Sequence, residues 1–335
     1  MKITSALATL FALAAATPTP TVDYAAEKAH LVKRASISDK ATLGYATLNG
    51  GEFTAAVNEK DTAARIVVVK GTISGTANVR IGSNKSVIGA SAGAGENLSP
   101  SYCPHTGSSP PTGFNGIGLH VRRMSNVIIR NIKSTNVLAS TGDGVKIEES
   151  INVWIDHCEF SSALVSDKDY YDGLVDASHA ADYMTISYTY FHDHWKTSLV
   201  GHSENNGAED TGHLRITYAN NYWANFGSRG PSLRFGTGHV YNSYYLNGNS
   251  GINTRQNAQV LIQSNVFKNV TVPITSQDSD IVGYAVAIDN DLGGASNLAP
   301  VGTMNANSPP YSYSLLGSAN VVATVPGQAG QKLTF

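Results

Sequence analysis

Three aspartates occupy short glycine-containing segments in the middle of the chain. Asp143 lies in Thr141-Gly142-Asp143-Gly144, and Asp172 and Asp176 lie in Asp172-Gly173-Leu174-Val175-Asp176. A separation of four residues places Asp172 and Asp176 on one side of an extended segment. Three carboxylates brought together would repel one another unless a cation lay between them, and Ca²⁺ accepts about six to eight oxygens in loose geometry. The alternative is a set of solvated aspartates, because Asp-Gly is a common turn pair.

Basic side chains follow these aspartates along the chain. Lys196 lies in His194-Trp195-Lys196-Thr197, and Arg229 and Arg234 lie in Arg229-Gly230-Pro231-Ser232-Leu233-Arg234. A planar guanidinium fits a carboxylate, so two arginines five residues apart near an acidic cluster indicate a site for an anionic substrate. Structural salt bridges are the alternative interpretation. We interpret His157 and Cys158, which follow an apolar segment, as packing residues and not as catalytic ones.

Six short segments that would position these residues share one pattern, in which a polar or small residue precedes a β-rich core. They are residues 125–131, 151–157, 182–188, 213–218, 238–242 and 258–265, with a fainter copy at 86–89. Aligning Val127, Val153, Met184, Leu214, Val240 and Val260 gives spacings of 26, 31, 30, 26 and 20 residues. A repeat of roughly 20–30 residues is typical of a solenoid, in which stacked neighbours bury each short strand.

The repeats predict an all-β fold, a single-stranded solenoid of the parallel β-helix type. No helix-length amphipathic segment separates them, which argues against a doubly wound α/β sheet, and a two-sheet sandwich is the alternative. A solenoid needs capped ends. Apolar residues at 53–57 and 63–64 predict a short N-terminal capping helix before a strand at Ile66–Val69, and residues 311–335 are expected to cover the other end. The Gly-, Ser- and Pro-rich stretch 91–116 predicts a surface loop.

Five segments resemble, in the same order, the signature segments of the polysaccharide lyase family 1 pectate lyases. They are Val153-Trp154-Ile155-Asp156-His157, the 172–176 run, Lys196 with Leu199-Val200-Gly201-His202-Ser203, the Arg-x-Pro-x-x-Arg run at 229–234, and Arg234-Phe235-Gly236-Thr237-Gly238-His239. The resemblance extends from about residue 80 to 290. It implies a right-handed parallel β-helix that cleaves the α-1,4 bonds of de-esterified pectin (polygalacturonate) by calcium-assisted β-elimination, which gives 4,5-unsaturated oligogalacturonates.

The resemblance also implies the metal ligands. Asp143, Asp172 and Asp176 match the calcium carboxylates of the family. Some members carry a further aspartate where this chain has Thr141. A hydroxyl is a poorer ligand than a carboxylate, so we expect calcium to bind weakly until the substrate adds its own oxygens.

The basic residues acquire roles from the same resemblance. Lys196 matches a substrate-binding lysine, Arg229 the proposed base that removes the C5 proton, and Arg234 a supporting arginine at the substrate. Calcium and Lys196 on the uronate would stabilise the enolate-like transition state. A guanidinium is ordinarily protonated at physiological pH, and nearby positive charges favour loss of its proton. We therefore predict an alkaline optimum.

Two other functional classes remain alternatives. The first is another β-helix enzyme. A pectin lyase would place a cation near the position of Asp172 and need no calcium, whereas a polygalacturonase would need adjacent aspartates, and no Asp-Asp pair occurs in the sequence. The second class is a non-catalytic wall-binding solenoid.

The N-terminal segments predict secretion to the extracellular space. Lys2 and the apolar run Leu7–Ala16 are typical of a signal peptide over residues 1–17, and residues 18–34 end in Lys33-Arg34 like a propeptide. The β-helix catalytic domain would then span 35–335. Secretion permits a bridge between the only two cysteines, Cys103 and Cys158, although two buried thiols are the alternative. Sequons at Asn84, Asn97 and Asn269 are candidate glycan sites.

Composition excludes several partners. Charged residues make up 14% of the chain, the net charge is −2, and no basic block is present. Duplex nucleic acid is therefore not an expected partner, because neutralising phosphates requires clustered Lys and Arg. No apolar run approaches the roughly 20 residues of a membrane span. We expect a monomer.

Overall fold

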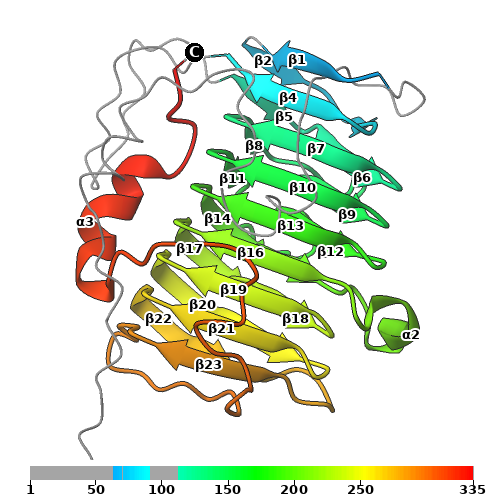
Figure 1. The fold of residues 1–335 in the computed structure, drawn as a ribbon. Helices are drawn as coiled ribbons and strands as arrows, with labels where there is room; N and C mark the ends of the chain where they lie inside the picture. Colours follow the sequence, from blue (N-terminus) through cyan, green and yellow to red (C-terminus); the bar gives the residue numbers. More distant parts are fainter. Residues whose placement is uncertain (1–62, 70, 91–111, 335) are drawn as a thin grey trace, which may run out of the picture.

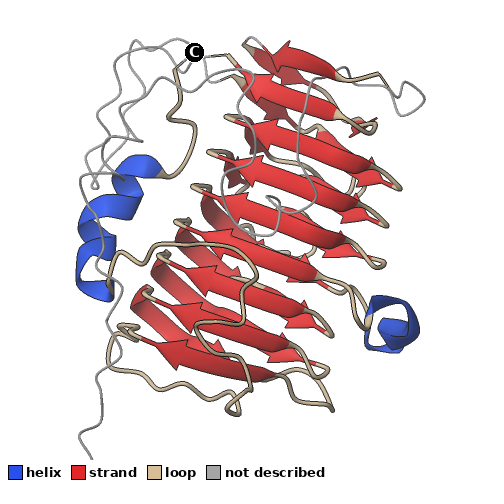
Figure 2. Cartoon of the chain, viewed as in Figure 1, coloured by secondary structure: helices blue, strands red, loops and turns tan. Residues whose placement is uncertain are grey.

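The computed structural model describes residues 63–69, 71–90 and 112–334. These residues fold into coils stacked along one axis, and all of the pairings between their named strands are parallel (Figure 1, Figure 2). The parallel β-helix that the repeats predicted is confirmed. The predicted signal peptide, propeptide, Asn97 and Cys103 lie outside the described residues.

Each coil contributes strands to three faces. The first face holds β1 (Arg65–Val69), β4 (Lys85–Gly89), β7 (Ser125–Arg130), β10 (Ile151–Asp156), β13 (Asp182–Ser187), β16 (Arg215–Ala219), β19 (Thr237–Tyr241), β21 (Gln259–Gln263) and β23 (Tyr284–Ile288). The second holds β2 (Thr72–Ser74), β5 (Gly113–Asn115), β8 (Lys133–Thr135), β11 (Glu159–Ser161), β14 (Tyr190–Lys196) and β17 (Tyr222–Ser228). The third holds β3 (Asn78–Arg80), β6 (Gly118–Arg122), β9 (Val145–Glu148), β12 (Val175–Ser178), β15 (Leu199–Val200) and β18 (Ser232–Arg234).

The long strand β20 (Tyr244–Arg255) joins the second and third faces. Its first half pairs with β17, its last residues pair with β18, and β22 (Val266–Thr275) pairs along its other side. Two short helices, η2 (Glu204–Asn206) and α2 (Gly207–Asp210), project between β15 and β16, and α3 (Ser318–Gln328) follows the last coil.

The core consists of columns of apolar side chains that run from coil to coil. Val127, Val153, Met184 and Ile216 lie side by side on the first face, and none of them is exposed. Burying one such side chain contributes about 1.5–3 kcal/mol, and each coil depends on its neighbours for that burial. Cys158 lies in this core as a free thiol, and burial raises its pKa to about 12.

The predicted register is wrong by two residues in two coils. Met184 lies beside Ile216 and not beside Leu214. In the next coil, Gly238 and not Val240 continues this column, because Ile216 lies beside Gly238 and Val240 pairs with Tyr218. Side chains alternate with a period of two, so a shift of two residues keeps each side chain on its face. An apolar pattern read from the sequence therefore cannot distinguish the two alignments.

The expected end caps differ from the structure. Ala63 and Ala64 form a bend and an irregular residue, while the remainder of the predicted helix, at 53–57, lies outside the described residues. The loop predicted for 91–116 gives way to a strand at Gly113, and its residues 91–111 are not described.

The C-terminal segment does not cover the last coil as predicted, but runs back along the side of the stack (Figure 1). Val321 and Val325 of α3 pack in a cluster with Tyr244 and Val266. Beyond the helix, the side chain of Gln331 donates to the carbonyl of Asn131, in a coil far from the C-terminal end (2.7 Å). The apolar face of α3 is buried by the outer side of the second face, which explains this path. No helix in the described ranges is long and apolar enough to cross a membrane.

One buried histidine fastens the C-terminal segment. His239 donates from Nε2 to Gln263 (3.1 Å), and its Nδ1 accepts from the hydroxyl of Tyr311 (2.9 Å). Burial lowers the pKa of His239 to about 4. As the pH falls, the unfolded chain therefore protonates this histidine near pH 6.5, whereas the native state does so only near pH 4. The free energy of unfolding consequently decreases as the pH falls from 6.5 to 4.

We predict that His239→Gln removes part of this acid sensitivity. Urea unfolding should show the wild-type chain losing about 2 kcal/mol more than the variant between pH 7 and pH 5. Equal losses in the two proteins over this interval would contradict the assignment.

Candidate active site

The candidate residues gather where the second face turns into the third. The turns of four successive coils, residues 136–144, 162–174, 197–198 and 229–231, lie one above another. Backbone hydrogen bonds join them: the amide of Gly144 donates to Gly173 (3.0 Å), that of Leu174 to Thr197 (3.0 Å), and that of Ser198 to Arg229 (2.8 Å). Stacking of these turns brings together side chains that are 86 residues apart in the sequence, from Asp143 to Arg229.

Two of the three aspartates are fixed by backbone amides. Asp143 is 3% exposed, and its Oδ1 accepts from the amide of Gly173 (2.9 Å). Asp176 projects outward from β12, and its Oδ1 accepts from the amide of Leu199 (2.9 Å). A Cβ on residue 173 would lie 2.3 Å from that same oxygen, so only glycine leaves space for the Asp176 carboxylate.

The aspartates lie close enough for their charges to interact. Burial and the charge of Asp172 raise the pKa of Asp143 to about 6, although Lys146 and Arg229 oppose the shift. Burial and Asp143 likewise raise the pKa of Asp176 well above its ordinary value. Among the residues that the structure describes, no group of three or more His, Cys, Asp or Glu side chains is placed to hold a metal ion by itself. Carboxylate oxygens are nevertheless the donors that a hard cation such as Ca²⁺ prefers, and a ligand that brings further oxygens could complete such a site.

Lys196 connects two carboxylates of the 162–174 turn. Its Nζ lies 3.3 Å from Oδ1 of Asp172 and 2.8 Å from Oδ1 of Asp169. The Lys196 side chain is 17% exposed, whereas that of Asp169 is 84% exposed. The ammonium is therefore held at the edge of the aspartates, and its outer partner lies in solvent.

Arginines form the other side of the site. Arg229 adopts a left-handed backbone (φ +61°), which is uncommon for a residue with a side chain, and its carbonyl accepts from Thr197 and Ser198. Burial is the largest cause that lowers the pKa of Arg234, and the positive charge of Arg229 lowers it further. Arg234 lies beside Arg255 in the β18–β20 register, and burial together with the other two arginines lowers the pKa of Arg255 to about 10. The Nε atoms of Arg234 and Arg255 are buried without a hydrogen-bond partner among the described residues.

Sequence analysis missed three residues of this site. Asp169 is one of several turn aspartates in sequence, and Arg255 lies outside the motif at 229–234. The sequence assigned His194 no role in the site, yet it donates from Nε2 to the carbonyl of Asp172 (2.6 Å) and accepts at Nδ1 from Ser162 (2.6 Å). Alternation from the buried Phe191 would place His194 outward, but a left-handed residue at Asp193 (φ +51°) interrupts the strand and His194 is buried, so the sequence pattern gave no signal for its structural role.

Fold and site together define a class, that of parallel β-helix proteins whose stacked turns bring acidic and basic side chains together on the outer surface. A family model described as pectate lyase matches residues 2–333. Pectate lyase A of Aspergillus niger is 49% identical, with 99% of this chain and 98% of the relative covered. Probable pectate lyase A of Aspergillus fumigatus is 50% identical, with 97% of each covered.

A solved structure agrees with these relatives. The pectate lyase of Bacillus sp. N165, crystallised in complex with trigalacturonate, superposes with a TM-score of 0.70 at 26% identity, over 87% of this chain and 98% of that chain. The chain belongs to the pectate lyase family.

We predict that His194→Ala loosens the 162–174 turn. Hydrogen exchange of its amides should accelerate, and the free energy of unfolding should fall by about 2–3 kcal/mol, because buried partners lose their hydrogen bonds. His213→Ala, at a histidine whose side chain is 47% exposed, serves as the control and should change stability by less than about 0.5 kcal/mol. Unchanged exchange in the turn would show that His194 does not hold it.

Proposed function

We propose that this protein is a pectate lyase that cleaves polygalacturonate by β-elimination. Membership of the pectate lyase family and the trigalacturonate complex of a structural neighbour support the substrate class. The observation that carries the proposal is the stacked turn junction, where Asp143, Asp172 and Asp176 face Lys196 and Arg229. Such a mixed site suits a substrate that carries a carboxylate on each sugar and requires charge neutralisation around the reacting one.

Calcium is the proposed cofactor, with Asp143, Asp172 and Asp176 as its protein ligands. Bound there, it would withdraw electron density from the uronate carboxylate and so acidify the neighbouring C–H bond. The raised pKa values of Asp143 and Asp176 support this set, because the native fold holds their repelling carboxylates in place. Thr141 adds no carboxylate, which leaves coordination positions for the oxygens of the substrate.

The basic residues perform the remaining steps. Lys196 exchanges Asp169 for the substrate carboxylate and keeps the ammonium on the developing enolate. Arg229 accepts the C5 proton, the C5–H electrons form the C4=C5 double bond, and the C4–O bond breaks. The departing sugar oxygen takes a proton from water. Arg234, held by the carbonyl of Gly201 (2.7 Å), supports the substrate and keeps positive charge beside Arg229.

The setting of the enzyme is part of the proposal. We infer that residues 1–17 are a signal peptide, that residues 18–34 are a propeptide, and that the catalytic domain at 35–335 acts outside the cell as a monomer. The sequence pattern of Lys2 to Arg34 and the likeness to fungal pectate lyases support this setting. Asn84 and Asn269 are candidate glycan sites, and the amide of Asn269 already donates to Asn247 (3.2 Å).

We predict that the protein releases unsaturated oligogalacturonates from polygalacturonate, as followed by ultraviolet absorbance. EDTA should abolish the absorbance increase, and EDTA saturated beforehand with Ca²⁺ should not. New reducing ends without unsaturated product would identify a hydrolase, and the absence of both would identify a binding protein.

We predict that Arg229→Lys lowers kcat by roughly 10²–10⁴-fold with a small change in KM, because the change removes the base and retains the charge. The wild-type rate should rise toward alkaline pH, because proton abstraction from C5 needs a base in its deprotonated form. Lys268→Ala, at an exposed residue of β22, is the control and should leave kcat unchanged. A variant with wild-type kcat would remove Arg229 from the mechanism.

A further inference from the structure

A short excursion of the chain packs against the arginine motif of the candidate active site. Residues 201–213 leave the third face after β15, contain η2 and α2, and return to the stack before β16. Gly201 and Gly212, near its two ends, adopt left-handed backbones (φ +81° and φ +88°), which are uncommon for residues with a side chain. We refer to residues 201–213 as the excursion.

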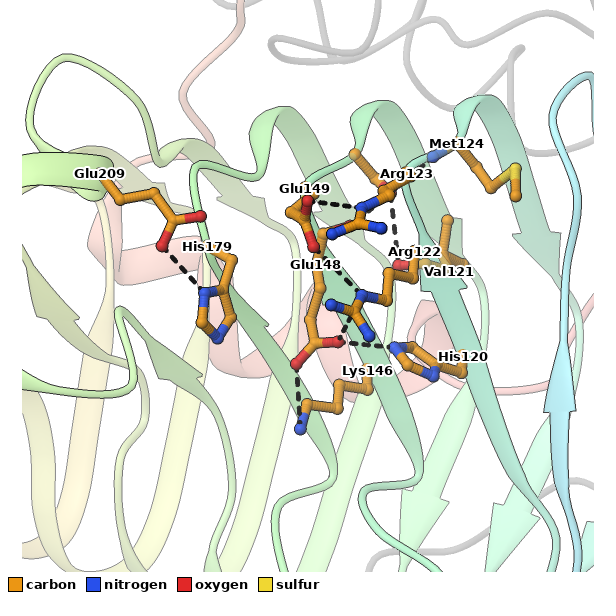
Figure 3. Close-up of polar contacts among 11 residues, drawn as sticks. His120, Val121, Arg122, Arg123, Met124, Lys146, Glu148, Glu149, His179 and Glu209 are labelled. Atoms are coloured by element: carbon orange, nitrogen blue, oxygen red, sulfur yellow. Dashed lines mark hydrogen bonds and ion pairs between the residues drawn. The ribbon is translucent and has the colours of Figure 1, made fainter. Parts of the chain in front are cut away.

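Buried contacts fix the base of the excursion on the preceding coil. Asp210 is fully buried, and its Oδ1 accepts from the amide of Ala180 (2.8 Å) while its Oδ2 accepts from the side chain of Asn206 (2.9 Å). Glu209 adds an exposed ion pair with His179 (2.9 Å; Figure 3). Exposed ion pairs add little stability, so the position of the excursion depends mainly on Asp210.

The far side of the excursion contacts Arg234 and Phe235. The carbonyl of Gly201 accepts from Nη1 of Arg234 (2.7 Å), and Oε1 of Glu204 lies 4.0 Å from Nε of the same guanidinium. A Cβ on residue 207 would lie 3.1 Å from the ring of Phe235, so the ring packs closely on Gly207. The excursion therefore holds Arg234 on the side of Nη1 and Nε.

These contacts leave one edge of the guanidinium open. Nη1 donates to Gly201, and Nε is buried with Glu204 as its ion-pair partner. In the described part of the chain, Nη2 of Arg234 donates to no protein acceptor. A guanidinium is planar and carries its N–H groups in a fixed fork, so holding two of its nitrogens sets the direction of the third.

Glu204 also supplies negative charge beside the buried arginines. Burial lowers the pKa of Arg234 and that of Arg255, and in both cases the charge of Glu204 opposes the effect. Hydrogen bonding with Ser279 is the largest cause that lowers the pKa of Glu204, and both arginines act in the same direction. The carboxylate is therefore ionised at neutral pH and favours the charged form of Arg234.

We propose that Glu204 is a positioning residue of the reaction, which acts through Arg234 by holding the Nε side of its guanidinium while Gly201 holds Nη1. Arg234 then meets the substrate with its remaining edge already oriented, and small misplacements of such a group cost large factors in rate. This inference rests on the proposed function, in which Arg234 supports the substrate. The competing explanation is a surface ion pair that does not affect the reaction.

The test is Glu204→Gln, assayed on polygalacturonate with Ca²⁺. Glutamine has nearly the same shape as glutamate but no charge with which to hold the guanidinium. We expect kcat to fall roughly tenfold, because Arg234 is no longer held in one orientation. KM should not rise, since the change also removes a negative charge near an anionic substrate. An unchanged kcat, or a loss that appears only as a higher KM, would overturn the proposal.

Glu209→Gln is the matched control. It removes the same charge from the same excursion, at a side chain of similar exposure (40% against 34%), but Glu209 pairs with His179 and not with Arg234. It should leave kcat unchanged. Equal losses in Glu204→Gln and Glu209→Gln would show that the effect comes from the excursion as a whole, which also contradicts the proposal.

A double-mutant cycle tests whether Glu204 acts through Arg234. In an Arg234→Lys background, Glu204→Gln should cause no further loss of kcat, because both changes remove the same interaction. Losses that multiply would mean that Glu204 acts independently of Arg234, against the proposal.

A measurement without turnover separates this proposal from the proposed function. The Nε–H signal of Arg234, assigned by its loss in Arg234→Lys, should exchange with water faster in Glu204→Gln than in the wild-type protein. The Nε–H of Arg130, which donates to Asp156 on the first face (2.8 Å), should exchange equally in both. Unchanged exchange at Arg234 would overturn the proposal, whereas faster exchange in a protein that releases no unsaturated product would contradict the proposed function alone.

Discussion

Parallel hydrogen bonding between successive coils is the constraint on which the rest of this molecule depends. It fixes the register of each coil on the next, so residues at matching positions lie one strand spacing apart, about 4.8 Å. The apolar columns of the core follow from this register, as do the outward positions that carry Lys146 and Asp176. The turns between the second and third faces obey the same constraint, since their backbone groups also pair from coil to coil.

The electrostatics of the site follow from that stacking. Asp143 and Asp176 are held by amides of the next coil, in positions that isolated carboxylates would avoid. The free energy of folding outweighs this repulsion between the carboxylates, because the turns cannot separate without disrupting the coils on both sides. Arg234 and Arg255 illustrate the same principle with the opposite sign of charge, because their register brings two guanidinium groups together. A site assembled in this way is prepared for charged ligands that compensate both clusters.

One of the five segments that resemble the family does not build the site. Val153-Trp154-Ile155-Asp156-His157 lies on the first face, where Asp156 accepts from Arg130 (2.8 Å), His157 (2.8 Å) and Ser187 (2.7 Å). Burial opposes ionisation of Asp156, but His157 and Arg130 outweigh it, so its pKa lies below the usual value. The hydrogen bonds of His157 agree with its interpretation as a packing residue. The segment fastens three coils together.

The sequence alone determined the repeating strands and the solenoid they form, because short-range alternation and repeat spacing are local properties. It named Asp143, Asp172, Asp176, Lys196 and Arg229 as candidates, but the stacking of the turns is what brings them together. Tertiary structure decided the features for which local sequence patterns allow more than one arrangement. It selected the register between Ile216 and Gly238, which period-two alternation cannot specify. It sent α3 back along the stack, and it brought Asp169, His194 and Arg255 into the site, because only contacts between distant coils distinguish these residues from other polar ones.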